Sequence, residues 1–236
     1  NGLDWPPVAL TMVGHLRLHN IRSALESVID AGVEGDFFEL GCWRGGASIY
    51  AKLVLSAYGE MHRKVRVFDA FGDYRVNYGK VTRYVSVPMD AVRTSFNDFG
   101  VLDEGVRFYA GLFSETLPAF LRERTTNRTD ANSIAVLRID GNFYSSYQDA
   151  MYFLWDLVPV GGIIIFDDFH SADVVRFWHD FKSDHALSES IVYLGTAHNV
   201  NVPAHAKISD LPRGPCVWFR KVSYVQVDQK KRRKWK

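Results

Sequence analysis

Cysteine is scarce in this sequence, and long apolar runs are absent. Only Cys42 and Cys216 occur among the 236 residues, which excludes a disulfide-stabilised scaffold and favours a reducing, cytoplasmic compartment. No stretch of about 20 uninterrupted apolar residues is present, so we expect no membrane-spanning helix. We see no secretory signal sequence either.

An excess of one charge sign is also missing, because the formal net charge is +1. This balance argues against a protein whose main task is to bind polyanions, and we expect no nucleic-acid partner. The exception is a run of basic residues at the C-terminal end, 230–236. We interpret this run as a solvated extension, with contact to a phosphate group or a membrane surface as the alternative.

The sequence does contain enough apolar material for one large core. Hydrophobic residues make up 47% of the chain and aromatic residues 14%, and no linker or internal repeat interrupts it. We therefore expect residues 1–236 to form a single domain, with an N-terminal helical or lid segment at 1–30 and the basic tail at 230–236. The sequence leaves open whether the chain forms a homo-oligomer or is one domain of a larger polypeptide.

Short apolar runs alternate with longer amphipathic stretches, which is the pattern of a parallel sheet with crossover helices. Strands are expected at 36–40, 65–68, 106–110, 134–139 and 163–166, and an antiparallel pair at 191–194 and 217–220. Helices are expected at 15–29, 47–57, 89–99, 114–123, 146–157 and 173–181, the fourth of them capped by Ser114. The prediction is an α/β, Rossmann-like fold: a mostly parallel central sheet with helices on both faces and an antiparallel edge strand.

Four of the predicted strands end in acidic or glycine-containing turns. These turns are Glu39-Leu40-Gly41, Asp69, Asp140 and Asp167-Asp168. In an open parallel sheet, ligands bind outside the carboxyl ends of the strands. We therefore expect these side chains to line one crevice.

The turn after the first strand favours S-adenosylmethionine over a dinucleotide. A dinucleotide fingerprint would need glycines at positions 41, 43 and 46, but position 43 is Trp43. The acidic Glu39 before Gly41 suits a ligand that carries an ammonium group. Asp69 can accept hydrogen bonds from the ribose hydroxyls of a nucleoside, and its alternative role is to cap the next helix.

Three carboxylates are expected close together at the ends of neighbouring strands. Asp140, Asp167 and Asp168 would repel one another and raise one another's pKa unless a hard cation such as Mg²⁺ lay between them. In the alternative arrangement, Asp168 caps the following helix and Asp140 pairs with a nearby arginine. A cation would stabilise a hydroxyl oxygen as it loses its proton, which suits methyl transfer to oxygen. His170, beside the acid pair, is a second candidate base.

Several motifs in this order resemble the macrocin-type O-methyltransferases, which methylate sugar hydroxyls of antibiotics with S-adenosylmethionine and Mg²⁺. The resemblance covers residues 36–221. It rests on ELGCWRGG (39–46), GLFSETLP (111–118), LRIDGNFYSS (137–146), the glycine pair at 161–162 with the aspartate pair at 167–168, and VWFRK (217–221).

The resemblance implies a class I methyltransferase fold, a sugar or glycan acceptor and specific site residues. It implies that Glu39, Gly41, Asp69, Gly111 and Phe113 bind the cofactor, to which we add Trp43 and Ser48 as candidates. It also implies that Asp140, Asp167 and Asp168 hold the metal ion and that Asp140 is the catalytic base, while His170 stays our second catalytic candidate. One departure matters, because the family has Asp-Gly-Asp where this chain has Asp140-Gly141-Asn142.

Two other functions remain open. Adjacent hydroxyls on an aromatic ring can also be held by a metal, so a catechol-type O-methyltransferase is one alternative. The other is a non-catalytic protein that binds S-adenosylmethionine, which Asn142 alone favours. The stretch from Tyr74 to Pro88 is unlike the family's lid, so the identity of the acceptor stays open.

Overall fold

The computed structural model describes residues 8–72, 85–126, 133–194, 200–202 and 216–233. In this part of the chain, eight strands form one sheet in the order β3-β2-β1-β4-β5-β8-β6-β7. The strands are β1 (Asp36–Leu40), β2 (Val65–Asp69), β3 (Val106–Ala110), β4 (Ile134–Ile139), β5 (Ile163–Phe166), β6 (Ile191–Tyr193), β7 (Val200–Val202) and β8 (Val217–Arg220). The first five run parallel, and the other three add an antiparallel region at one edge.

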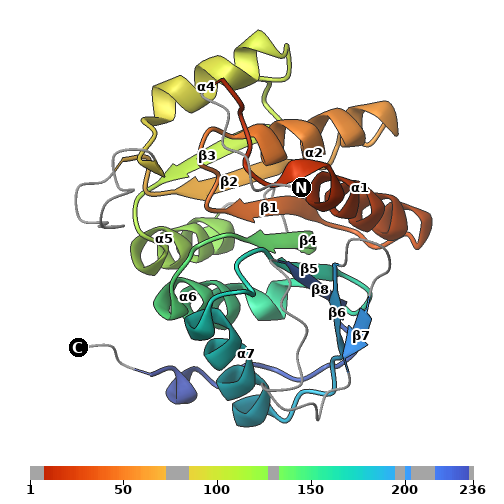
Figure 1. The fold of residues 1–236 in the computed structure, drawn as a ribbon, viewed down its shortest axis with the longest axis vertical. Helices are drawn as coiled ribbons and strands as arrows, with labels where there is room; N and C mark the ends of the chain where they lie inside the picture. The colour runs from red at the N-terminus through yellow and green to blue at the C-terminus, as the bar shows by residue number, and fades with distance from the viewer. Residues whose placement is uncertain (1–7, 73–84, 127–132, 195–199, 203–215, 234–236) are drawn as a thin grey trace.

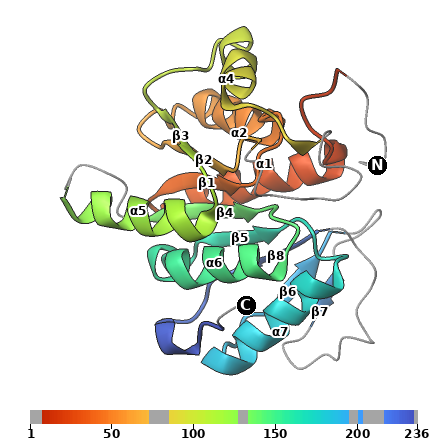
Figure 2. The ribbon, with the colours of Figure 1, turned by 90° about the vertical axis from the view of Figure 1, so that its left-hand side faces the viewer.

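The helices lie in two layers, one on each face of the sheet (Figures 1 and 2). One layer holds α1 (Gly14–Asp30), α2 (Gly46–Ala57) and α4 (Met89–Asp98), and the other holds α5 (Phe113–Thr126), α6 (Tyr144–Leu154) and α7 (Ala172–His185). Each layer covers its own apolar core. Because both faces are covered, β1, β4 and β5 are buried along their whole length, and β5 is apolar throughout.

The predicted architecture is confirmed, including the antiparallel pairing of β6 with β8. Several bounds differ, and α7 continues to His185 instead of ending at Phe181. The helix predicted from a cap at Ser114 begins at Phe113 instead, so Ser114 lies within its first turn. The helix predicted at 146–157 ends as α6 at Leu154 and continues as a 3₁₀ turn, Trp155–Leu157. The three-residue edge strand β7 was not predicted, because so short a segment carries no clear alternation.

The C-terminal segment packs against α6 and α7 after β8. A 3₁₀ turn, Gln229–Lys231, is followed by Arg232, which pairs with Asp149, and Arg233, which pairs with Asp180. Arg232 is half-buried and Arg233 is exposed, so this part of the expected extension is solvated although it is paired with α6 and α7. Residues 234–236 lie outside the described part. None of the helices in the described ranges is long and apolar enough to cross a membrane, as expected.

Candidate functional site

The carboxyl ends of β2, β1, β4 and β5 lie side by side at one edge of the sheet. Leu40 is in register with Phe68 on one side and with Ile139 on the other, and Ile139 is in register with Phe166. The acidic and glycine-containing turns that follow these residues therefore meet, as the sequence predicted. The ends of β1 and β4 are also tied beyond the sheet, since the Asp140 N–H donates to the Leu40 carbonyl at 2.8 Å.

Gly41 lets the loop after β1 lie directly against the end of β4. Its φ of 89° is in the left-handed region, and a Cβ here would overlap the main-chain oxygen of Asp140. Its own N–H donates to the Phe68 carbonyl at 2.8 Å. The loop after β1 can therefore pack against the loop after β4 only because residue 41 is a glycine.

Asp69 supports the loop after β1 from beneath. One carboxylate oxygen accepts from the N–H groups of Cys42, at 2.7 Å, and Trp43, at 3.3 Å. The other accepts from the Phe71 N–H at 2.8 Å. Burial raises the pKa of Asp69 although these three N–H donors favour its ionised form. Trp43 and Phe71 both have a positive φ, 50° and 48°, so the carboxylate holds two strained turns in place.

Glu39 and Ser48 lie beneath the loop, and both are fully buried. The Ser48 hydroxyl donates to one Glu39 oxygen, and the Arg138 guanidinium donates to the other. Burial raises the pKa of Glu39, against the opposing effects of Arg138 and Ser48. The two side chains therefore connect the start of α2 to β4.

Gly111 and Phe113 lie at the same edge of the sheet, just after the end of β3. The Gly111 N–H donates to the Asp69 carbonyl at 3.0 Å, so the two strand ends stay together. A Cβ on Gly141 would lie 3.1 Å from the Phe113 ring, which therefore packs against the Asp140 loop. The residues predicted to bind cofactor and those predicted to bind metal thus share one continuous site.

Arg138 is the central charged group at the ends of β4 and β5. Its side chain is 2% exposed, and its guanidinium pairs with Glu39, with Asp167 and, at 2.8 Å, with Asp140. Asp167 is also paired with Arg17 of α1 at 2.9 Å. Burial opposes ionisation of Asp167, but Arg138 and Arg17 outweigh it and lower the pKa of this carboxyl.

Asp168 is held by different partners. One carboxylate oxygen accepts from the Asn142 N–H at 2.7 Å and lies 3.3 Å from the Tyr147 hydroxyl. The residue that caps α7 is Ser171, so this part of the alternative arrangement is wrong, whereas the pairing of Asp140 with an arginine is observed. Asn142 has a φ of 62°, which turns its main-chain N–H toward Asp168.

The carboxylates outnumber the cations around them. Glu39, Asp140, Asp167 and Asp168 face the two guanidinium groups of Arg17 and Arg138, so full ionisation leaves a formal excess of two negative charges. Burial and Asp168 raise the pKa of Asp140 well above its usual range, and burial and Asp167 raise the pKa of Asp168.

Oxygen donors with this excess of charge fit a hard divalent cation. Among the described residues, no three His, Cys, Asp or Glu side chains are grouped as a ready metal-binding cluster. The hydrogen bonds give the reason, because Asp167 faces two guanidinium groups while Asp168 faces the Asn142 N–H. The donor set is therefore suitable, and its carboxylates would need to turn toward a cation.

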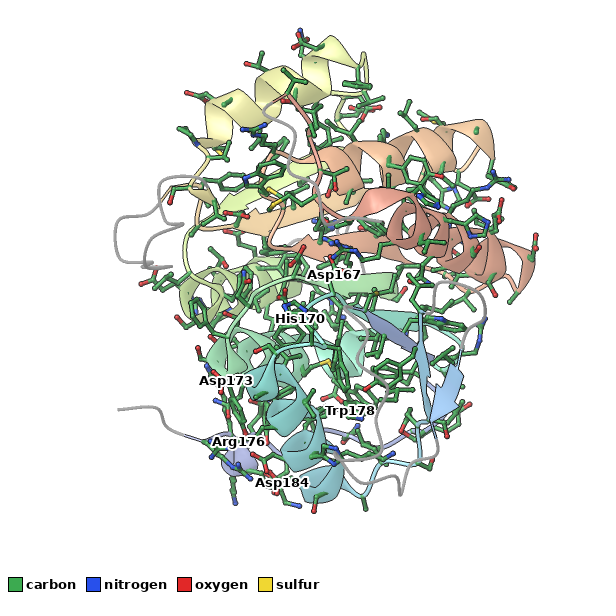
Figure 3. All side chains as sticks on the ribbon, in the orientation of Figure 1. Asp167, His170, Asp173, Arg176, Trp178 and Asp184 are labelled. Carbon is green, nitrogen blue, oxygen red and sulfur yellow. The ribbon has the colours of Figure 1, made fainter. Side chains whose placement is uncertain are left out.

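Sequence analysis missed three residues of this site: Arg17, Arg138 and Tyr147. The Tyr147 hydroxyl donates to the Ile139 carbonyl at 2.9 Å and accepts from the Asp168 N–H at 3.1 Å, so it bridges β4 and β5. An arginine inside the otherwise apolar strand 134–139 was the one available signal. His170 is exposed and lies near Asp167 ahead of α7, as Figure 3 shows.

A family model described as macrocin-O-methyltransferase (TylF) matches residues 1–198. A tetracenomycin-type enzyme, 8-demethyl-8-(2,3-dimethoxy-alpha-L-rhamnosyl)-tetracenomycin-C 4'-O-methyltransferase of Streptomyces olivaceus, is 36% identical over 203 residues, 80% of this chain and 74% of the relative. Mycinamicin III 3''-O-methyltransferase of Micromonospora griseorubida is 34% identical over 206 residues, 81% and 78% of the two chains.

Solved structures agree with these sequence matches. The O-methyltransferase NovP has a TM-score of 0.76 and 29% identity, and the match covers 94% of this chain and 86% of NovP. The calicheamicin methyltransferase CalS11 has a TM-score of 0.61 at 16% identity, covering 89% and 81%, and supports the fold alone. The order of the strands, without β7, is the same as in the class I methyltransferase fold.

Proposed function

This chain belongs to the TylF macrocin-O-methyltransferase family and is an S-adenosylmethionine-dependent O-methyltransferase. We propose that it methylates a sugar hydroxyl of a glycosylated small molecule with the help of a divalent cation. The proposal rests mainly on one contact. Gly41, in the loop after β1, lies directly against the main chain of Asp140, which belongs to the cluster of carboxylates at the ends of β4 and β5. Residues 1–236 would form a single catalytic domain, since the described strands all join one sheet.

We assign the cofactor to the crevice around Asp69, Gly111 and Phe113. The described donors to Asp69 are three N–H groups and the Cys42 thiol. The Asp69 side chain is only half-buried, so its carboxylate could still meet a ribose hydroxyl. Glu39 and Ser48 would support the loop from beneath rather than touch the cofactor, because both are fully buried. Gly41 and Trp43 would face the cofactor with their main chain.

Asp140, Asp167 and Asp168 are the proposed ligands of Mg²⁺ or another divalent cation. When bound, the cation would supply positive charge that stabilises the acceptor oxygen as its proton leaves. The protein's own contribution is orientation: Tyr147 and the Asn142 N–H fix Asp168, and Arg138 fixes Asp140. Methyl transfer needs the acceptor oxygen in line with the methyl group, and a fixed carboxylate frame favours that pose.

Asp140 is the proposed general base, with His170 as the second candidate. The Asp140 side chain is 29% exposed, whereas that of Asp167 is 1% exposed, so only the former is open to an acceptor. The position of the family's second acid is occupied here by Asn142, whose amide cannot accept a proton at neutral pH. Proton removal would therefore depend on Asp140 or on the exposed His170.

The acceptor class separates this proposal from the catechol alternative. Purified protein is incubated with S-adenosylmethionine, Mg²⁺ and two acceptor sets, rhamnosylated aromatic polyketides and plain catechols. We expect methylation of the sugar and complete loss of turnover in chelator, restored by Mg²⁺. Methylation of catechols alone would contradict the sugar assignment, and full turnover in chelator would contradict the cation. Binding of S-adenosylhomocysteine by calorimetry without turnover on either set would mean that the acceptor belongs to neither of these two classes.

A further inference from the structure

The segment before α1 lies across the loop after β1. We call residues 8–13 the N-terminal strap. The Gly46 N–H donates to the Leu10 carbonyl at 2.9 Å, and the Arg44 guanidinium donates to the Ala9 carbonyl at 2.9 Å. A Cβ on Gly46 would lie 2.5 Å from the Leu10 oxygen, so this glycine is needed for the close approach of the strap. The strap therefore occupies the N-terminus of α2, next to the proposed cofactor crevice.

Arg17 ties the same strap to the carboxylate group. Its Nε donates to the Val13 carbonyl at 2.7 Å, and one terminal nitrogen donates to the Met12 carbonyl at 3.0 Å. The other terminal nitrogen donates to Asp167 at 2.9 Å. The guanidinium thus joins the end of the strap to the end of β5, across a sequence separation of 150 residues.

We propose that Arg17 competes with the divalent cation for Asp167, and that this competition couples cation binding to release of the N-terminal strap. This inference rests on the proposed function. Both Asp167 oxygens accept from guanidinium groups, one from Arg17 and one from Arg138. A cation that binds Asp167 must displace one of them, because like charges on one buried carboxylate repel strongly.

Of the two arginines, Arg17 is the one that the cation displaces from Asp167. Arg138 is held by three carboxylates and is 2% exposed. Arg17 is 16% exposed, and its guanidinium also donates to the neutral carbonyls of Met12 and Val13, which hold a cation less strongly than carboxylates do. Once Arg17 leaves Asp167, the strap keeps its contacts to Arg44 and Gly46 but loses this tie to β5. A cofactor entering beside Gly46 would then meet a looser strap.

Binding of Mn²⁺ to the full chain tests the competition directly. Arg17→Met removes the competing charge and keeps the length of the side chain, so Mn²⁺ should bind on the order of ten-fold more tightly, a typical size of coupling between sites. Arg22→Met is the matched control, because Arg22 lies on the same helix, pairs with Glu26 and is 52% exposed. Its affinity for Mn²⁺ should equal that of the wild type. Arg17→Lys, which keeps the charge, should stay close to the wild type.

Amide exchange of residues 9–17 supplies the second measurement. In the wild type, Mn²⁺ should speed exchange in this segment, and in Arg17→Met exchange should be fast already and insensitive to Mn²⁺. Equal or weaker Mn²⁺ binding by Arg17→Met, in a variant with unchanged circular dichroism, would overturn the competition. Slower exchange of the strap with Mn²⁺ would overturn the release. If no variant binds Mn²⁺, the proposed cation site itself fails, and this inference fails with it.

Discussion

The proposed cofactor half of the site (residues 40–48 and 69–71) is held mainly by main-chain N–H groups that donate to one carboxylate. The proposed cation half (residues 138–142 and 167–168, together with the buried Glu39) is held mainly by pairs of charged side chains. In the first half, Asp69 collects three N–H groups. In the second, one arginine is shared by three carboxylates. Main-chain geometry persists whatever is bound, but a charge network rearranges when a new charge enters.

Because of this difference, the two halves should be sensitive to different kinds of substitution. A change of backbone conformation should damage the cofactor half, and a change of charge should damage the cation half. Gly41 joins the halves, because its loop lies against the main chain of Asp140. Each variant below is therefore compared with a control in which the same residue type is replaced outside the proposed site.

Arg138→Met should have the largest effect on stability. It leaves three carboxylates without their common partner in a buried position, and removing one member of a buried ion pair costs about 3–5 kcal/mol of unfolding free energy. Urea unfolding of the variant measures this loss. Mg²⁺ should restore part of it, because the cation would neutralise the same carboxylates.

Arg66→Met is the control for this variant. Arg66 is also fully buried and pairs with Asp36 at 2.8 Å, but Asp36 lies at the opposite, amino end of β1. Its loss should also destabilise the protein, without any recovery in Mg²⁺. If Mg²⁺ raises the unfolding free energy of both variants equally, the carboxylates around Arg138 do not bind the cation specifically.

Gly41→Ala should have an intermediate effect. The methyl group would overlap the Asp140 carbonyl and strain a left-handed residue, so the loop must move away from β4. Gly59 is the control, since its φ is 74° and nothing lies within 4 Å of a Cβ there. Gly59→Ala should cost about 1–2 kcal/mol for the backbone alone, and Gly41→Ala about 1–3 kcal/mol more for the overlap.

Cofactor binding separates the two glycine variants further. Gly41→Ala should weaken binding of S-adenosylhomocysteine by calorimetry, because the loop that borders the crevice is displaced. Gly59→Ala should bind like the wild type. If both variants bind alike, the contact between the halves does not matter for the cofactor.

Much of the fold and the location of the site could be predicted from the sequence, because both depend on local patterns. Apolar runs bounded by turns identify β1 to β5, and parallel strands place their carboxyl ends together. The roles of Arg17, Arg138 and Tyr147 could not be predicted. Arg17 and Asp167 are 150 residues apart, and nothing local indicates that they meet.

The burial of Glu39 was equally hidden in the sequence. An acid before a glycine loop resembles a ligand-binding residue, but its partner in the fold is Arg138, 99 residues away. Tertiary charge pairing thus decides which of these acids is fully buried. Asp140, after the end of β4, keeps partial exposure, and Glu39, within β1, does not.

Tyr147→Phe should have the smallest effect and tests the cation half at one oxygen atom. The change removes the hydroxyl that joins Ile139 to Asp168 and keeps the ring, which packs edge-on against Phe166. A lost hydrogen bond of this kind costs about 1 kcal/mol of unfolding free energy. Tyr152→Phe is the control on the same helix, because the Tyr152 ring packs on Phe181 and His185 in the core between α6 and α7.

The two tyrosine variants should differ more in cation affinity than in stability. In the variant, the Asp168 N–H loses the oxygen that accepts from it, so the orientation of Asp168 is less fixed. Loss of a group that orients a metal ligand lowers metal affinity by about 10- to 100-fold, and Mn²⁺ titration of Tyr147→Phe measures this. Unchanged affinity would mean that the strand ends alone position Asp168, and the cation half would then resemble the cofactor half in being fixed by its main chain.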